Sequence, residues 1–111
     1  MKTGKTIAIL GTGAWGTALS MTMLRAGHDV RLWGRDGETA AAINERHENP
    51  HYLPGIRLDD GLAATTDAGA ALRDSDCILM VTPAQTLHAV LDELKDRIPA
   101  GAPLVLCAKG I

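Results

Sequence analysis

The 111-residue sequence predicts one α/β domain built on a doubly wound parallel sheet, and three observations carry this prediction. Two runs, residues 7–10 and 77–81, are apolar at every position, as buried strands of a parallel sheet are. Such runs alternate with segments of helical periodicity, which is typical of right-handed β-α-β crossovers. A glycine-rich turn, GTGAWG, directly follows the first run. We therefore expect a single domain over residues 1–111 with strand order 3-2-1-4-5.

The expected strands are short runs rich in aliphatic and β-branched residues, at 5–10, 30–33, 62–65, 77–81 and 104–107. The first helix runs from the glycine turn to Gly27, with Arg25 in its last turn. Its apolar residues at helical spacing predict the face that packs on the sheet: Trp15, Ala18, Leu19, Thr22, Met23 and Ala26.

The other helices are expected at 37–48, 68–73 and 85–97. The helix at 37–48 has only a thin apolar face, so it is expected to lie outside and to pack weakly; that face consists of Ala40, Ala41 and Ile43. Asp67 is suited to cap the helix at 68–73. The last helix has one apolar face, made of Leu87, Val90, Leu91, Leu94 and Ile98. Two prolines and a glycine predict an irregular loop at 49–55.

Composition excludes several classes of function. The net charge of -2 gives no basic excess for nucleic acid or an anionic membrane surface. No apolar run approaches the roughly 20 residues of a membrane span, and the N-terminal apolar run is too short for a signal peptide, so we expect a cytoplasmic protein. Cys77 and Cys107 lie in apolar runs and are expected to be buried free thiols, with a disulfide as the less favoured alternative. No metal site is expected, because the cysteines and the histidines lack ligand spacing: His28, His47, His51 and His88.

The glycines of the turn have the spacing G-x-G-x-x-G, at Gly11, Gly13 and Gly16. The first allows a tight turn, the second lets a pyrophosphate approach the backbone, and the third lets the helix pack on the strand. Backbone N–H groups, including those of Thr12 and Ala14, would then face the phosphates at the helix N-terminus. This pattern predicts a bound dinucleotide; the alternative is a tight turn without a ligand.

The end of the second strand indicates which dinucleotide binds. Arg35 lies 19 residues after Gly16, close to the roughly 20 expected for the residue that contacts the adenosine ribose. An arginine there favours NADP, because it can pair with a 2′-phosphate. Asp36 follows directly and is suited to a 2′-hydroxyl, which leaves NAD open. The alternative for Arg35 is an ordinary exposed loop residue.

Four other residues are candidates with competing structural explanations. Trp15 flanks the cofactor or belongs to the core. Tyr52 leans on the cofactor or fastens its loop to the sheet. Pro83 follows the fourth strand beside the expected nicotinamide end and stiffens that loop. Lys109 follows the fifth strand, where a lysine can polarise a carbonyl or hold a substrate phosphate, unless it is a plain surface residue.

Several segments together resemble bacterial NAD(P)-dependent glycerol-3-phosphate dehydrogenase: GTGAWGTAL, LWGR, the N-x-x-YLPG loop from Asn49 to Gly55, ILMVTPAQ and the final AKGI. The resemblance implies an oxidoreductase that interconverts dihydroxyacetone phosphate and sn-glycerol 3-phosphate for phospholipid synthesis. It implies cofactor contacts from Ala14, Trp15, Arg35 and Tyr52. It also implies that Lys109 is catalytic and touches both cofactor and substrate.

The sequence departs from the family at two points. Family members continue into a helical domain that supplies a second lysine, an aspartate and the groups that hold the substrate phosphate, and no such domain is present here. We therefore expect dinucleotide binding without turnover, and self-association through an uncovered apolar surface. Ala14 stands where relatives often have serine. The alternatives are the cofactor domain of another NADP-dependent dehydrogenase and a nucleotide-sensing module without catalysis.

Overall fold

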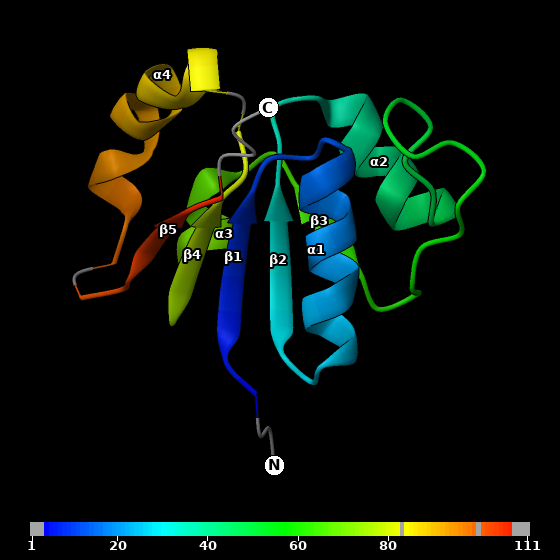
Figure 1. Ribbon diagram of the computed structural model, residues 1–111, viewed down its shortest axis with the longest axis horizontal. Helices are drawn as coiled ribbons and strands as arrows, with labels where there is room; N and C mark the ends of the chain where they lie inside the picture. The colour runs from blue at the N-terminus through cyan, green and yellow to red at the C-terminus, as the bar shows by residue number, and fades with distance from the viewer. Residues whose placement is uncertain (1–3, 83, 100, 108–111) are drawn as a thin grey trace.

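The chain folds into a five-stranded parallel sheet, seen in a computed structural model that describes residues 4–82, 84–99 and 101–107 (Figure 1). The strand order is β3-β2-β1-β4-β5, and all four neighbouring pairs are parallel, as predicted. The strands are β1 (Thr6–Leu10), β2 (Asp29–Trp33), β3 (Ala63–Thr65), β4 (Cys77–Met80) and β5 (Leu104–Leu106). The strand order reverses at β1, so the carboxyl ends of β1 and β4 flank the crevice where doubly wound sheets bind ligands.

The helices are α1 (Ala14–Arg25), α2 (Gly37–Arg46), α3 (Ala68–Leu72) and α4 (Ala84–Leu94), and α4 continues into a 3₁₀ turn, η1 (Lys95–Arg97). In Figure 1, α1 lies in front of the sheet and α3 behind it. Because side chains alternate along a strand, β1 supplies both layers of the core. Ile7 and Ile9 pack with α1 and α2, whereas Ala8 and Leu10 pack with α3 and α4.

The predicted packing face of α1 is wrong. Trp15 is 49% exposed, and the residues buried on this helix are Gly16, Thr17, Ser20 and Met21. The reason is the third glycine of the turn: α1 can approach the sheet closely only with Gly16 facing inward, and the residues four positions away along the helix follow it. Leu19 and Met23, which belong to the predicted face, are half-buried and pack against the core.

The prediction that α2 packs weakly is also wrong, although two residues of its predicted face, Ala40 and Ile43, are buried. Ile43 is fully buried in the layer that α1 and α2 cover, and Ala42 is buried where Ala41 was expected. Asn44 adds a polar attachment, because its side-chain amide both donates to the carbonyl oxygen and accepts from the N–H of Ala64 in β3 at 2.8 Å. A thin apolar stripe was therefore enough to anchor this helix, since two hydrogen bonds to the edge strand complete the contact.

The remaining expectations on elements hold within a few residues. Asp67 caps α3 by accepting from the N–H groups of Gly69 and Ala70. Val90 and Leu94 are the buried residues of the apolar face of α4. Both cysteines are free and half-buried, and burial raises the pKa of the Cys107 thiol, with a smaller contribution from Cys77. None of the helices in the described part of the chain is long and apolar enough to cross a membrane.

Candidate functional site

The glycine turn lies between the ends of β2 and β4 and contacts both. Gly11 has a φ of 133°, which side chains other than glycine rarely adopt, and its N–H donates to the carbonyl oxygen of Trp33 at 2.7 Å. A Cβ atom on Gly11 would lie 2.8 Å from the carbonyl oxygen of Val81. Gly11 therefore meets two demands at once: a left-handed turn and contact with the neighbouring strand end.

The second glycine, Gly13, lies at the N-terminus of α1 and faces open space. Gly13 is the N-cap of α1 and, having no side chain, makes no capping hydrogen bond to the N–H groups of the first helical turn. The first turn carries no acidic residue, and a Cβ atom on Gly13 would meet no described atom within 4 Å. Unpaired N–H groups and the positive end of the helix dipole favour an anion at such a position. The exposed residues Ala14 and Trp15 begin the helix at this opening.

The third glycine fixes the helix against the turn. A Cβ atom on Gly16 would lie 2.0 Å from the carbonyl oxygen of Gly11, so no larger residue fits without a shift of the backbone. Gly16 thus sets how closely α1 approaches the first turn residue. Gly11 and Gly16 thus have separate structural reasons, as the spacing predicts, whereas the role of Gly13 toward a pyrophosphate stays a prediction.

A fourth glycine, Gly34, lies where the end of β2 contacts the glycine turn. Thr12 is buried, and a Cβ atom on Gly34 would lie 2.4 Å from its side chain. The next residue, Arg35, is therefore held beside the glycine turn. Its guanidinium is 55% exposed and pairs with Glu93 of α4, with Nη2 and Oε1 2.5 Å apart.

The side chain of Asp36 caps the N-terminus of α2. One carboxylate oxygen accepts from the N–H of Glu38 at 3.0 Å, and the other accepts from the hydroxyl of Thr39 at 2.8 Å. These two bonds, that from Thr39 foremost, lower the pKa of Asp36, and His51 adds a smaller charge effect. The side chain is thus the N-cap of α2, and its expected alternative role toward a ribose hydroxyl stays a prediction.

A buried asparagine ties the loop after α2 to the glycine turn. The side-chain nitrogen of Asn49 donates to the carbonyl oxygen of Thr12 at 2.8 Å and to the hydroxyl oxygen of Thr17 at 2.9 Å. Its side-chain oxygen accepts from the N–H of Tyr52 at 3.2 Å. Asn49 is fully buried, so these bonds are shielded from water. One side chain therefore holds together the turn, α1 and the loop that carries Tyr52.

Tyr52 and Trp15 are among the few large hydrophobic residues left on the surface. Tyr52 is 54% exposed, and its nearest described ring is that of His51, with centroids 6.3 Å apart. Neither side chain belongs to the core, so the core alternative that the sequence left open for Trp15 is excluded. Both remain available for a ligand. Pro83 and Lys109 lie outside the described residues, and so their predicted roles stay predictions.

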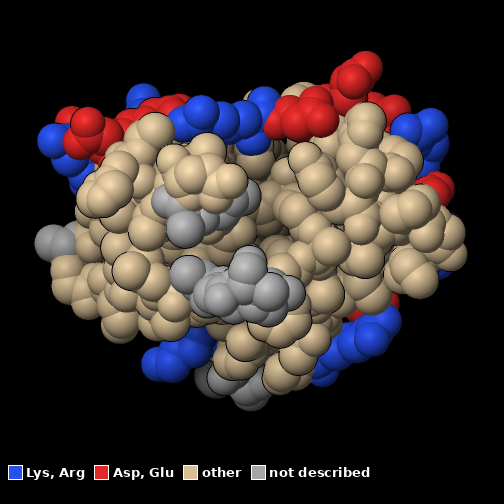
Figure 2. Space-filling view, turned by 45° about the horizontal axis from the view of Figure 1, so that its top comes forward, with Lys and Arg blue, Asp and Glu red and all other residues tan. Residues whose placement is uncertain are grey.

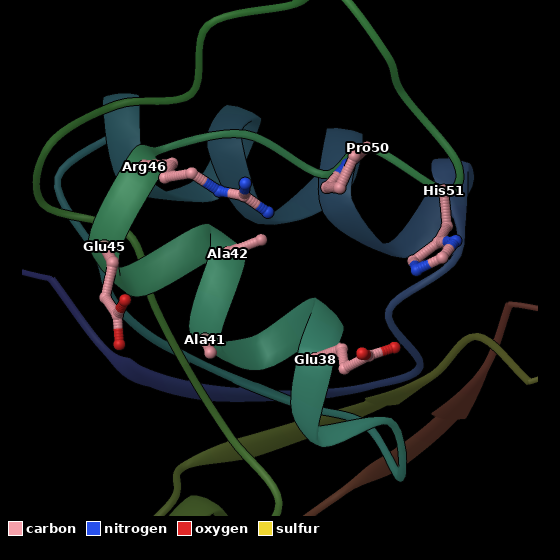
Figure 3. Close-up of a pocket in the computed structure, with 7 residues that line it drawn as sticks. All are labelled: Glu38, Ala41, Ala42, Glu45, Arg46, Pro50 and His51. Atoms are coloured by element: carbon pink, nitrogen blue, oxygen red, sulfur yellow. The ribbon is translucent and has the colours of Figure 1, made fainter.

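Figure 2 shows the face over the carboxyl edge of the sheet. The described residues on it are mostly uncharged, and Lys, Arg, Asp and Glu side chains lie in a mixed band along its upper rim and again at its lower edge. A pocket of ≈ 490 Å³ lies between α2 and the loop that follows it, as Figure 3 shows, with Arg46 extending from the helix toward Pro50. The residues that line this pocket include none of the glycine turn, so we do not assign the dinucleotide to it.

Comparison with known proteins decides the family. Residues 6–111 match the family model described as NAD-dependent glycerol-3-phosphate dehydrogenase N-terminus. The chain belongs to this family. It is 59% identical over 105 residues to the glycerol-3-phosphate dehydrogenase [NAD(P)+] of Mesorhizobium japonicum and 53% identical over 105 residues to that of Rhodospirillum rubrum. Each match covers 95% of this chain and 30% of the relative, so the chain spans about a third of the length of these relatives.

Solved structures of family members have the same fold. The glycerol-3-phosphate dehydrogenase of Coxiella burnetii superimposes with a TM-score of 0.85 at 34% identity, covering 96% of this chain and 34% of that one. The Saccharomyces cerevisiae enzyme gives a TM-score of 0.84 at 29% identity, covering 95% of this chain and 33% of that one. The resemblance seen in the sequence is thus confirmed for this N-terminal domain.

Sequence reasoning missed two side chains that organise the site. Asn49 was noticed only as part of the N-x-x-YLPG segment, although an asparagine three residues before a loop N–H is a common way to stabilise a turn. Glu93 gave no signal at all, since it is one acidic residue on the exposed side of a helix. Its contact with Arg35 joins residues 58 positions apart, which no local pattern reveals.

Proposed function

We propose that this chain is the dinucleotide-binding part of a glycerol-3-phosphate dehydrogenase and that it binds NAD or NADP across the carboxyl edge of its sheet. The opening of α1 at Gly13 carries the proposal. There, the N–H groups of the first helical turn, the positive end of the helix dipole and the absence of a side chain at the N-cap combine at one point. The pyrophosphate would bind at this point, and Arg35 would hold the adenosine ribose end. The exposed rings of Trp15 and Tyr52 would flank the bound molecule.

The complete protein would interconvert dihydroxyacetone phosphate and sn-glycerol 3-phosphate, as the names of the relatives suggest. When bound, the reduced dinucleotide would supply the hydride in one direction, and the oxidised form would accept it in the other. The chain's own residues bind and orient the dinucleotide, and Lys109 would polarise the substrate carbonyl beside the nicotinamide while Pro83 shapes that end of the site. In a protein of full family length, normal turnover by a Lys109→Met variant would contradict the proposed role of Lys109 in polarising the carbonyl.

The binding proposal is tested by calorimetric titration of this chain with NADPH and with NADH at one salt concentration. Loss of the charged hydrogen bonds from Arg35 to a 2′-phosphate should weaken NADPH binding by about tenfold or more in Arg35→Ala, with little change for NADH. Arg57→Ala is the matched control, because Arg57 is also an exposed arginine in an ion pair, with Asp60 at 2.7 Å. Absence of binding by the unmodified chain to either cofactor would contradict the proposal.

A further inference from the structure

The proposed site contains a carboxylate that no sequence pattern marks. Glu93 lies on α4, across the carboxyl edge of the sheet from the end of β2, and its Oε1 is 2.5 Å from Nη2 of Arg35. The side chains of the two residues are 48% and 55% exposed, so a ligand can reach the pair from solvent. The guanidinium expected to hold the adenosine ribose is therefore already engaged by an acid.

The acid that follows Arg35 in sequence is engaged at the start of α2. Asp36 uses both carboxylate oxygens to cap α2, one on the N–H of Glu38 and one on the hydroxyl of Thr39. In sheets of this type, an acidic side chain at this position accepts a hydrogen bond from the ribose 2′-hydroxyl of NAD. With Asp36 occupied, the carboxylate in contact with Arg35 comes instead from α4.

We propose that Glu93 is a specificity-determining residue that disfavours the 2′-phosphate of NADP and thereby keeps NAD usable at this site. The inference rests on the proposed function. A 2′-phosphate bound to Arg35 must displace Glu93 or lie beside it, and both choices are unfavourable, because one breaks an ion pair and the other brings two negative groups together. The neutral 2′-hydroxyl of NAD meets no such repulsion and can donate to the Glu93 carboxylate.

The negative charge of Glu93, and not the size of its side chain, disfavours NADPH relative to NADH in this proposal. An isosteric change that removes only the charge therefore tests the proposal. In Glu93→Gln the carboxylate becomes an amide of the same shape. We expect NADPH to bind about three- to tenfold more tightly, since one unit charge at contact distance in a partly exposed site is removed. NADH should bind within about twofold of the unmodified chain, or slightly more weakly, because a neutral amide is a poorer acceptor than a carboxylate. A charge reversal, Glu93→Lys, should raise the preference for NADPH further.

Asp92→Asn is the matched control. Asp92 precedes Glu93 on the same helix and pairs with Lys95 at 3.5 Å, so the control removes one negative charge nearby without touching Arg35. It should shift the ratio of NADPH to NADH affinity by less than Glu93→Gln does. Circular dichroism of all variants checks that α4 is intact. Raising the salt concentration should shrink the effect of Glu93→Gln, because the repulsion is screened.

The outcomes separate this inference from the proposed function. If the unmodified chain binds neither cofactor, the proposed function fails and the inference fails with it. If the chain binds and Glu93→Gln leaves the affinity ratio unchanged, or shifts it no more than Asp92→Asn does, only the inference is overturned. If Glu93→Gln weakens NADPH binding, Glu93 positions Arg35 for the phosphate instead of competing with it, and the inference is likewise overturned.

Discussion

At the scale of single residues, Asn49 contributes most to the shape of the candidate site. It satisfies the carbonyl oxygen of Thr12, the hydroxyl of Thr17 and the N–H of Tyr52 from one fully buried side chain. Buried polar groups of this kind are costly when they lose their partner, because no water replaces it. The rigidity of the glycine turn and the position of the loop that carries Tyr52 thus depend on the same side-chain amide, that of Asn49.

Replacement of Asn49 by alanine should lower the free energy of unfolding by about 2–4 kcal/mol, since it leaves a small cavity and removes the partners of buried groups. Asn44→Ala is the comparison, because Asn44 makes two hydrogen bonds to Ala64 but is an exposed residue, and its loss should cost about 1 kcal/mol. Urea denaturation of both variants measures the difference. Equal losses would show that burial is not what makes Asn49 important.

At the scale of elements, two glycines in the turn between β1 and α1 have different surroundings. Gly16 faces the carbonyl oxygen of Gly11, whereas Gly13 faces open space. The two positions are three residues apart in one motif, yet the fold needs only one of them to lack a side chain. The open position is the one where we place the pyrophosphate.

This difference predicts opposite results for two similar substitutions. Gly16→Ala should destabilise the domain by more than about 3 kcal/mol or prevent folding, because its Cβ would overlap backbone. Gly13→Ala should stay within about 1 kcal/mol of the unmodified chain, the range of N-cap effects, and yet weaken NADH binding. Thermal unfolding and calorimetry on the two variants test this. A Gly13→Ala variant that binds NADH normally would contradict the placement of the pyrophosphate.

At the scale of the whole molecule, the sheet is left exposed at β5. This strand pairs with β4 on one side, and its three residues are 37%, 43% and 54% exposed, although all are aliphatic: Leu104, Val105 and Leu106. An apolar edge strand with free N–H and carbonyl groups is a template for pairing with another chain. The surface on which we expect self-association of this chain is therefore β5.

The chain should form dimers or larger species as its concentration rises, and Leu106→Lys should reduce this, because a charged side chain on an edge strand opposes strand pairing. Thr22→Lys, at an exposed position on α1, adds the same charge elsewhere and should leave association unchanged. Sedimentation velocity over a range of concentrations distinguishes the species. A monomer at every concentration would contradict the expectation.

The sequence by itself determined the order and type of the elements, the strand order and the nature of the first turn. These depend on local patterns: apolar runs for β1 and β4, and three glycines at fixed spacing. Tertiary structure decided which face of α1 is buried, because the approach at Gly16 outweighed the apolar periodicity that pointed to Trp15.

Tertiary structure also decided which side chains meet at the site. Asn49 reaches Thr12 across 37 residues, and Glu93 reaches Arg35 across 58. The periodicity of a helix or a strand relates only residues that are a few positions apart, so it reveals neither pair. Each contact forms only when the sheet brings its strand ends together. The sequence thus shows the residue types that can bind a dinucleotide, whereas the contacts that orient them arise from packing, since distant segments meet only in the folded chain.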